Sequence, residues 1–298
     1  MKDTLLPNGV YVAALTPLKA DLTPDIEMLA DHCQSLLATG AQGLALMGTT
    51  GEANSFSIDE RKELLEQLLA KGVDPKKIML GTGCCSYTDT IDLTSHALKM
   101  GVSSILLLPP FYYKQISDND LYTYFKMVIE AVGKNDLEIY LYHFPKMTGL
   151  NFSLSLLEKL IHDFPANFVG MKDSGGDPAH MAEIIAHFPG FKLFAGTEKY
   201  LLDVLRLGGA GCISATANIT APKCVEVFEY WQSDLADALQ QELVAQRNIF
   251  EGLPFVGILK QSLAEIKDNP QWLHVRPPNG LVPNEFVKQV LGKIEAMS

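Results

Sequence analysis

The chain has 298 residues, 47% hydrophobic and 20% charged, a balance that excludes intrinsic disorder and leaves enough apolar surface for a large core. Its formal net charge of -11, without a long run of Lys and Arg, excludes the basic footprint of a nucleic-acid-binding protein. No stretch approaches the roughly 20 apolar residues of a membrane span, and Pro, Asn and Gly interrupt the first segment, so we expect a cytoplasmic protein without a membrane partner.

The cysteines and histidines show no metal-binding spacing. The five cysteines are odd in number and lack a C-x-x-C pair, which favours reduced thiols over disulfides or a zinc site. His180 and His187 could share one helix face, where two surface histidines explain the pattern better than a metal does. The sequence therefore predicts no metal site.

Short apolar runs alternate with helical patterns along most of the chain. Their continuous apolar character is typical of strands that are buried on both faces. The eight runs begin at Val10, Gly43, Ile78, Ser104, Ile139, Phe168, Lys192 and Gly211.

Amphipathic patterns fill the intervals between these runs. Residues 24–40 carry an apolar stripe and end at Gly40. Residues 57–72 open with the capping-box spacing of Ser57 and Glu60. Similar helical patterns cover residues 118–133, 153–165 and 199–209.

A strand followed by a helix, repeated about eight times at roughly 30 residues per unit, predicts a (β/α)8 TIM barrel. A doubly wound sheet is the alternative, but it would bring a glycine-rich nucleotide-binding turn after its first strand, and ALTPLKADLTPD is not such a turn. The eighth unit ends near Trp231. We therefore expect a catalytic barrel over residues 1–231 and a C-terminal helical extension, residues 232–298, packed on it.

Active sites of such barrels lie at the carboxyl ends of the strands. The sixth run ends in Lys172, and strand alternation places Phe168, Gly170 and Lys172 on one face. If that face is the barrel interior, Gly170 leaves room for the lysine and burial favours a neutral amine that can attack a carbonyl. Spacing alone leaves open that Lys172 emerges into solvent.

Two other strand ends carry polar groups. Tyr142 on the fifth run could exchange protons beside the lysine, although core tyrosines are common. The turn GTTGE, residues 48–52, offers backbone N–H groups and two hydroxyls, which suit a carboxylate. Together the three features fit a small 2-oxo acid held as an imine, without a metal or a separate cofactor.

The segments GTTGE, PPFYYK, YHFPKMTG, VGMKDSGGD and ISATANI follow one another in this order along the chain. They resemble the dihydrodipicolinate synthase and N-acetylneuraminate lyase family of class I, Schiff-base-forming, pyruvate-dependent aldolases. The resemblance covers nearly the whole chain and implies a barrel enzyme, usually a homotetramer built as a dimer of dimers.

The resemblance also implies roles for individual residues. Lys172 matches the Schiff-base lysine and Tyr142 the tyrosine that shuttles its protons. Thr49 and Thr50, after Gly48, match the pair that holds the pyruvate carboxylate, with Thr49 also in a hydroxyl relay. Tyr113, or its neighbour Tyr112, matches a tyrosine that completes this relay in the adjacent subunit.

Further residues are expected to bind substrate. Ile213 matches a position that contacts pyruvate through its backbone. Gly196 and Glu198 fall in the turn where the sialic-acid lyases have G-x-D-E, of which one acidic residue is present here. Ser174 follows the lysine as in 4-hydroxy-2-oxoglutarate aldolases.

The synthases of this family carry an arginine for the carboxylate of their aldehyde substrate, and Met147 takes its place here. Methionine cannot form a bidentate pair with a carboxylate. We therefore expect an aldolase or lyase that forms or releases pyruvate, with a 4-hydroxy-2-oxoglutarate or 2-keto-3-deoxy sugar acid type of substrate. The alternatives are 4-hydroxy-tetrahydrodipicolinate synthase, which condenses pyruvate with aspartate semialdehyde, a sugar-acid dehydratase, and a non-catalytic sensor of 2-oxo acids.

Overall fold

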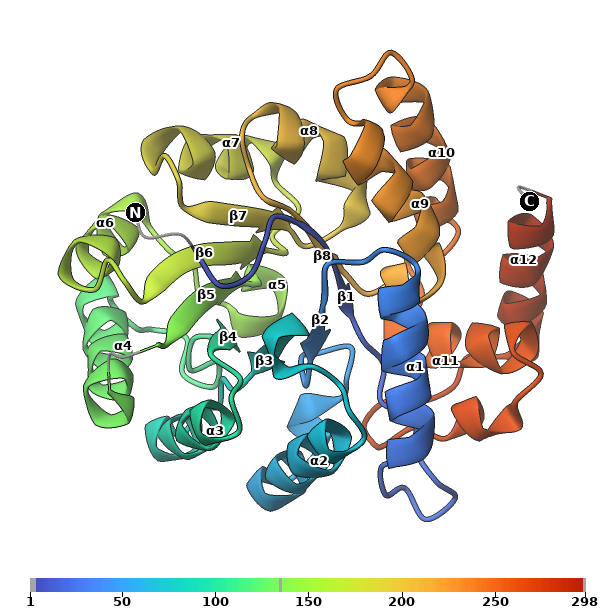
Figure 1. The fold of residues 1–298 in the computed structure, drawn as a ribbon, viewed down its shortest axis with the longest axis horizontal. Helices are drawn as coiled ribbons and strands as arrows, with labels where there is room; N and C mark the ends of the chain where they lie inside the picture. Colours follow the sequence, from blue (N-terminus) through green and yellow to red (C-terminus); the bar gives the residue numbers. More distant parts are fainter. Residues whose placement is uncertain (1–3, 134–135, 297–298) are drawn as a thin grey trace.

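The computed structural model describes residues 4–133 and 136–296, and it contains the predicted barrel (Figure 1). Eight parallel strands close in sequence order, because β1 pairs with both β2 and β8. The strands are β1 (Gly9–Ala13), β2 (Gly43–Leu46), β3 (Ile78–Gly81), β4 (Ser104–Leu107), β5 (Glu138–His143), β6 (Phe168–Asp173), β7 (Lys192–Ala195) and β8 (Gly211–Ser214). All eight lie where the apolar runs predicted them.

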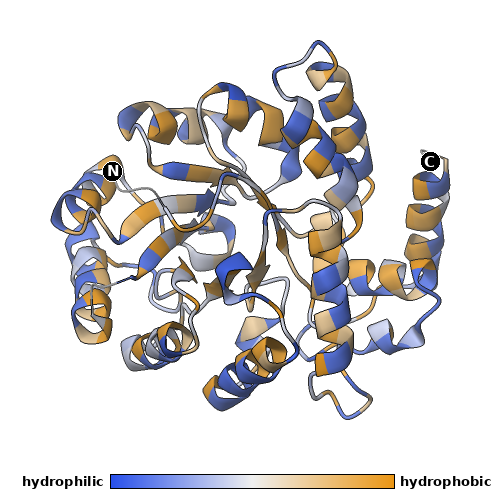
Figure 2. Ribbon diagram, in the orientation of Figure 1, coloured by the Kyte–Doolittle hydropathy of each residue, from blue (hydrophilic) through white to orange (hydrophobic). Residues whose placement is uncertain are grey.

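Helices surround the strands on the outside (Figure 1). They are α1 (Ile26–Ala38), α2 (Ile58–Ala70), α3 (Tyr87–Lys99), α4 (Asp118–Val132), α6 (Leu154–Asp163), α7 (Pro178–His187), α8 (Leu201–Arg206) and α9 (Ala217–Tyr230). The predicted capping box at Ser57 and Glu60 is present at the start of α2. Figure 2 shows apolar and polar residues on opposite sides of several of these helices, as expected for helices packed on a barrel.

The barrel has two separate apolar cores. The outer core fills the layer between strands and helices. The inner core lies inside the barrel and includes Tyr11, Met79, Leu106, Tyr140 and Phe194. Polar side chains at the carboxyl ends of the strands therefore stand above a packed floor and not above a channel.

The sequence predicted that Phe168, Gly170 and Lys172 share one face of the strand. This prediction is wrong for Phe168. The pairing of β5 with β6 shifts by one residue, since Ile139 pairs with Phe168 whereas Tyr140 pairs with Gly170. This irregularity turns Phe168 into the outer core. Beyond it the alternation is regular, and Lys172 pairs with inward-facing Tyr142.

Gly170 also has a different role from the predicted one. A Cβ atom at this position would lie 2.6 Å from Cδ1 of Tyr140 and 2.5 Å from the carbonyl oxygen of Lys192. Glycine is therefore required for the close approach of the Tyr140 ring, one layer below Lys172.

Three more helices follow the barrel: α10 (Ala236–Asn248), α11 (Phe255–Ile266) and α12 (Asn284–Glu295). Figure 1 shows α11 beside α1, with α12 at the outer edge of the molecule. Leu15, from the loop after β1, joins the apolar cluster formed by α11 and α12, so the extension shares a core with the barrel. The division at residue 231 stays a prediction. No helix of the described residues is long and apolar enough to cross a membrane.

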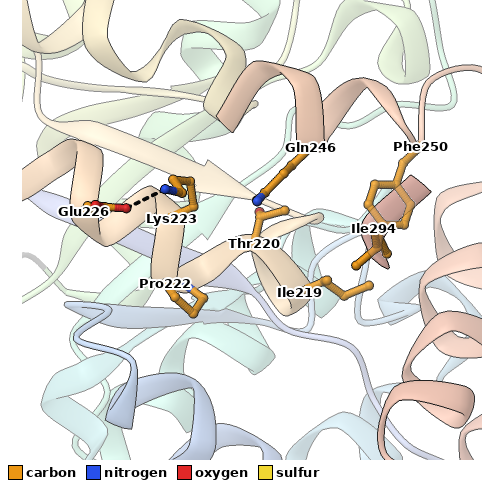
Figure 3. A pocket seen from close by; sticks show the side chains of 8 residues that line it. All are labelled: Ile219, Thr220, Pro222, Lys223, Glu226, Gln246, Phe250 and Ile294. Atoms are coloured by element: carbon orange, nitrogen blue, oxygen red, sulfur yellow. Dashed lines mark ion pairs between the residues drawn. The ribbon is translucent and has the colours of Figure 1, made fainter. Parts of the chain in front are cut away.

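A cavity of about 400 Å³ lies among α9, α10 and α12 (Figure 3). Its walls include Thr220, Gln246, Phe250 and Ile294, and Lys223 pairs with Glu226 at its edge. None of the residues expected to bind substrate lines this cavity.

Candidate active site

Lys172 and Tyr142 lie side by side at the carboxyl end of the barrel. The two residues are paired across β5 and β6, and both are buried, at 5% and 3% exposure. The Lys172 Nζ atom lies 4.4 Å from the centre of the Tyr142 ring. The ring of Phe144 stacks on the Tyr142 ring, with centroids 5.7 Å apart. Lys172 therefore does not emerge into solvent, and its amine borders an aromatic wall.

The Lys172 amine has no counter-charge nearby. Within the described residues, no carboxylate oxygen lies within 4.0 Å of its nitrogen and no hydrogen bond holds it. The Tyr142 ring is therefore the neighbour that the structure gives this nitrogen, and no ion pair holds the amine away from a substrate.

The turn after β2 has open donors. Glu52 N–H donates to the carbonyl of Thr49 at 3.1 Å, and the Thr16 hydroxyl donates to the carbonyl of Gly51 at 2.9 Å, which fixes the turn. A Cβ atom at Gly48 would meet no atom within 4 Å, so open space adjoins the turn. In the described part of the chain, neither the Thr49 nor the Thr50 hydroxyl has a hydrogen-bond partner. These groups can receive an anion.

Three further predicted residues lie at neighbouring strand ends. Ile213 on β8 belongs to the inner core together with Tyr142. The Gly196 N–H donates to the carbonyl of Asp173 at 2.6 Å, and a Cβ atom there would lie 2.1 Å from the Ser174 hydroxyl oxygen. Gly196 therefore leaves space that the Ser174 side chain occupies, and the half-exposed Ser174 hydroxyl stands beside the β7 turn.

Glu198 is fully buried among hydroxyl groups. The hydroxyls of Ser214 and Thr216 donate to its two carboxylate oxygens, and Thr220 adds a bond of 2.8 Å. The Arg247 Nε atom lies 3.8 Å away. Because every carboxylate oxygen already accepts a bond from the protein, Glu198 braces β8 and α9 in this structure. Its expected role in substrate binding stays a prediction.

The aromatic residues of PPFYYK lie on the surface. Tyr112 and Tyr113 are 73% and 71% exposed and make an edge-to-face pair with centroids 5.3 Å apart. Lys114 anchors this segment by donating to the carbonyls of Phe111 and Thr148. The tyrosine pair is thus exposed on a loop that Lys114 holds in place.

The loop after β5 forms a short helix, α5 (Pro145–Thr148), that the sequence did not predict. Met147 on this helix is 60% exposed, and its neighbour Lys146 is also exposed. The Lys146 Nζ atom would lie 3.7 Å from a Cβ atom at Gly176, so it extends over the loop after β6.

A buried ion pair behind the GTTGE turn was missed from the sequence. Glu52 binds Lys260 of α11, and both side chains are fully buried. The Arg276 N–H donates to the second Glu52 oxygen at 2.8 Å. The partners lie 208 and 224 residues apart in the chain, so no spacing pattern could have revealed them.

Comparisons with known proteins agree with this architecture. The sequence profile of the Dihydrodipicolinate synthetase family matches residues 6–297. An uncharacterized DapA-like lyase of Chloroflexus aurantiacus is 33% identical over 267 residues, 89% of each chain. The putative 2-dehydro-3-deoxy-D-gluconate aldolase YagE of Escherichia coli K12 is 30% identical over 287 residues, 93% of each chain.

Two solved structures superpose closely. The structure of YagE in complex with pyruvate has a TM-score of 0.88 and 25% identity, covering 97% of this chain and 98% of that one. The dihydrodipicolinate synthase of Agrobacterium tumefaciens has a TM-score of 0.88 and 30% identity, covering 97% and 99%.

Proposed function

Because the chain belongs to the dihydrodipicolinate synthetase family and is a lyase of that family, we propose that it forms or releases pyruvate through an imine on Lys172. The observation that carries this proposal is the buried amine of Lys172, which has no carboxylate within ion-pair distance in the described residues. A neutral amine beside an aromatic ring can act as the nucleophile that attacks a keto carbon.

The first half of the reaction is imine formation. The neutral Lys172 amine attacks the keto carbon of a 2-oxo acid, and the resulting carbinolamine takes up a proton and loses water to give a protonated imine. Thr49 and Thr50 hold the substrate carboxylate, with Gly48 leaving the space for it. The Tyr142 hydroxyl carries the protons that these steps exchange.

The second half is carbon–carbon cleavage. The bond between C3 and C4 of a 4-hydroxy-2-oxo acid breaks, its electron pair moves into the imine to give an enamine, and the C4 hydroxyl loses its proton as the aldehyde forms. Protonation of the enamine at C3 and hydrolysis of the imine release pyruvate and the free lysine. The relay of Tyr142, Thr49 and a partner subunit's Tyr113 accepts and returns the protons.

We assign a 4-hydroxy-2-oxo acid of the 4-hydroxy-2-oxoglutarate or 2-keto-3-deoxy sugar acid type as the substrate. Met147 offers no charge for a second carboxylate, which speaks against aspartate semialdehyde and, by the same argument, favours the sugar-acid type over 4-hydroxy-2-oxoglutarate. The similarity to YagE, whose name is that of a putative sugar-acid aldolase, supports the sugar-acid type. Ser174 and Gly196 adjoin each other on the β6 and β7 turns, where they would face the distal hydroxyls.

The exposed Tyr112 and Tyr113 support an assembly of at least two subunits. An aromatic pair more than 70% exposed on a fixed loop is costly in water and suits an interface. We propose that Tyr113 enters the site of a neighbouring subunit in a homotetramer.

Borohydride trapping tests the proposal. Intact protein is treated with pyruvate and borohydride, and we expect the mass of one reduced pyruvate adduct, mapped by peptide analysis to Lys172. Lys62, a surface lysine paired with Asp92, serves as the internal control and stays unmodified. Absence of an adduct, or an adduct spread over surface lysines, contradicts the proposal.

Turnover assays separate the remaining functions. Release of pyruvate from a 2-keto-3-deoxy sugar acid or from 4-hydroxy-2-oxoglutarate identifies the aldolase, and loss of water with carbon chain retention identifies a dehydratase. Condensation of pyruvate with aspartate semialdehyde, followed in a coupled reductase assay, identifies the synthase. Pyruvate binding without proton exchange at its methyl group identifies a sensor.

A further inference from the structure

Three metal-ligating side chains converge on the outer side of the barrel. His143 ends β5, Asp173 ends β6, and His180 lies on α7. One nitrogen or oxygen atom from each lies within 4.8 Å of the others. Because strand side chains alternate, His143 and Asp173 point away from the pocket that Tyr142 and Lys172 face. The cluster is thus separate from the proposed active site.

The buried Asp173 carboxylate is the centre of the cluster. Its Oδ2 atom lies 2.6 Å from Nδ1 of His180, and its Oδ1 atom lies 4.0 Å from Nε2 of His143. The Gly175 N–H donates to Oδ1 at 2.8 Å and fixes the carboxylate. The two imidazole rings stack, with centroids 4.6 Å apart. Two imidazoles therefore bracket a single oriented carboxylate.

Within the described residues, the His143 ring has no hydrogen-bond partner. Its ring is buried, its Nδ1 atom has no hydrogen bond, and the 4.0 Å separation of Nε2 from Asp173 is too long for one. An imidazole without hydrogen bonds is costly to bury. The position therefore calls for a partner from outside the chain.

Gly175 leaves a space between the two separated atoms. A Cβ atom there would lie 3.0 Å from Oδ1 of Asp173 and 3.2 Å from Nε2 of His143. Bonds from a transition metal to nitrogen or oxygen measure about 2.0 to 2.2 Å. An ion between atoms 4.0 Å apart can therefore reach both, and a small approach of the side chains gives a normal bond angle.

We propose that His143, Asp173 and His180 bind one divalent first-row transition metal such as Zn²⁺. Two imidazoles with one carboxylate suit Zn²⁺, Co²⁺, Ni²⁺ or Fe²⁺, whereas Mg²⁺ and Ca²⁺ require mostly oxygen ligands. His180 exchanges its hydrogen bond to Asp173 for a bond to the ion. Its side chain is 23% exposed, so ions enter past it and water completes the coordination. This proposal departs from the sequence-based prediction of no metal site.

Cobalt titration tests the site in the absence of turnover. Full-length protein is stripped with a chelator and titrated with Co²⁺, whose visible absorption reports nitrogen and oxygen ligands. We expect one ion per chain, displaced by one equivalent of Zn²⁺. Because no substrate is used, the result is independent of whether Lys172 forms an imine.

Three variants locate the ion. We expect His180→Gln to weaken Co²⁺ binding at least about tenfold, because it removes one of the three ligands. Gly175→Ala fills the space without removing a ligand and should weaken binding similarly. His162→Gln is the matched control, since His162 also lies 2.9 Å from a carboxylate, that of Asp163, but lacks a second histidine. It should bind as the unaltered protein does.

The proposal is overturned if the protein binds no Co²⁺ at micromolar concentration, or if His180→Gln and Gly175→Ala bind as tightly as His162→Gln. Intense near-ultraviolet absorption would indicate that a thiolate binds the ion, and Cys85 is the exposed thiol. If this absorption persisted at the same intensity in His180→Gln, it would also overturn the proposal.

Discussion

Among the described residues two lysines are buried, and their surroundings are opposite in kind. Lys260 is fully buried against the Glu52 carboxylate and also donates to the carbonyl of His274 at 2.8 Å. Lys172 is also buried but has an aromatic ring, and no carboxylate, beside it in the described residues. A buried ammonium needs a counter-ion, whereas a buried neutral amine does not. Burial alone therefore does not distinguish the two lysines, and the counter-ion that Lys260 has and Lys172 lacks is the basis of the role that we propose for Lys172.

Lys260, Glu52 and Arg276 form a buried brace behind the turn of Thr49 and Thr50, where we propose that the substrate carboxylate binds. Burial lowers the pKa of Lys260 below its usual value, and the Glu52 carboxylate opposes that effect. Glu52 has a left-handed backbone, with φ of 59°, which is uncommon for a residue other than glycine and is held by its surroundings. The brace thus ties the turn of Thr49 and Thr50 to the C-terminal helices.

The largest expected effect follows from removing the unpaired lysine. Lys172→Ala should lower turnover by roughly 10⁴-fold or more, because no other group can form the imine. Far-ultraviolet circular dichroism and thermal melting should show a folded protein, since no ion pair is broken. If the folded variant turned over substrate nearly as fast as the unaltered protein, the proposed role of Lys172 would be wrong.

Removing the paired lysine should affect stability instead of chemistry. Lys260→Met leaves the Glu52 charge buried and should lower the free energy of unfolding by roughly 3 to 5 kcal/mol in urea titrations. The double variant Lys260→Met, Glu52→Gln should recover part of this loss, because the second change removes the orphaned charge. Lys62→Met, which breaks the exposed pair with Asp92, should cost about 1 kcal/mol or less.

The folded fraction of Lys260→Met should still form the Lys172 adduct with pyruvate and borohydride. Loss of the adduct from protein that remains folded by circular dichroism would show that the two lysines are not separable in function.

A smaller effect is expected at the tyrosine beside the unpaired lysine. Tyr142→Phe keeps the ring that borders Lys172 but removes the hydroxyl, so imine formation should slow by roughly 10²-fold while pyruvate still binds. The rate is measured by quenching with borohydride at timed intervals. Tyr140→Phe, one layer deeper in the same strand, is the matched control and should keep the rate of the unaltered protein. Equal rates in both variants would remove Tyr142 from the proton relay.

Most of the fold could be predicted from the sequence, because buried strands and amphipathic helices leave local patterns. Alternation along β6 predicted the face of Lys172. It failed for the face of Phe168, because the register shift depends on the neighbouring strand β5. Glu198 shows the same limit at the site: a turn motif gives the position of a carboxylate but not the hydroxyls of Ser214 and Thr216 that surround it.

Pairs formed across the fold were beyond the sequence. Glu52 and Lys260 are far apart in the chain, and each alone is an ordinary charged residue. His143 and Asp173 are neighbours only through the pairing of β5 with β6, so their spacing carries no ligand signature.

The smallest expected effect concerns the outer end of the brace. The guanidinium group of Arg276 binds both carboxylate oxygens of Glu60, at 2.6 and 3.0 Å, and lowers the pKa of Glu60 to about 2. A carboxylate whose pKa is lower in the folded than in the unfolded chain adds stability above the unfolded value, and that stability is lost as the pH falls from about 4.5 toward 2. Glu60 is partly exposed, so solvent screening limits the effect to about 1 kcal/mol.

Glu60→Gln should therefore lower the free energy of unfolding slightly at about pH 6, where the carboxylate is charged. It should also flatten the fall of that free energy as the pH drops from about 4.5 toward 2, which urea titrations at a series of pH values measure. Glu66→Gln is the control, because Glu66 pairs on the surface with His96. If both variants had the same pH dependence in this window, the brace would end at Glu52 and Arg276 would serve only to close that buried pair. If they differ, the stabilising charge network extends from the buried pair of Lys260 and Glu52 to the surface, whereas Lys172 has no such continuation.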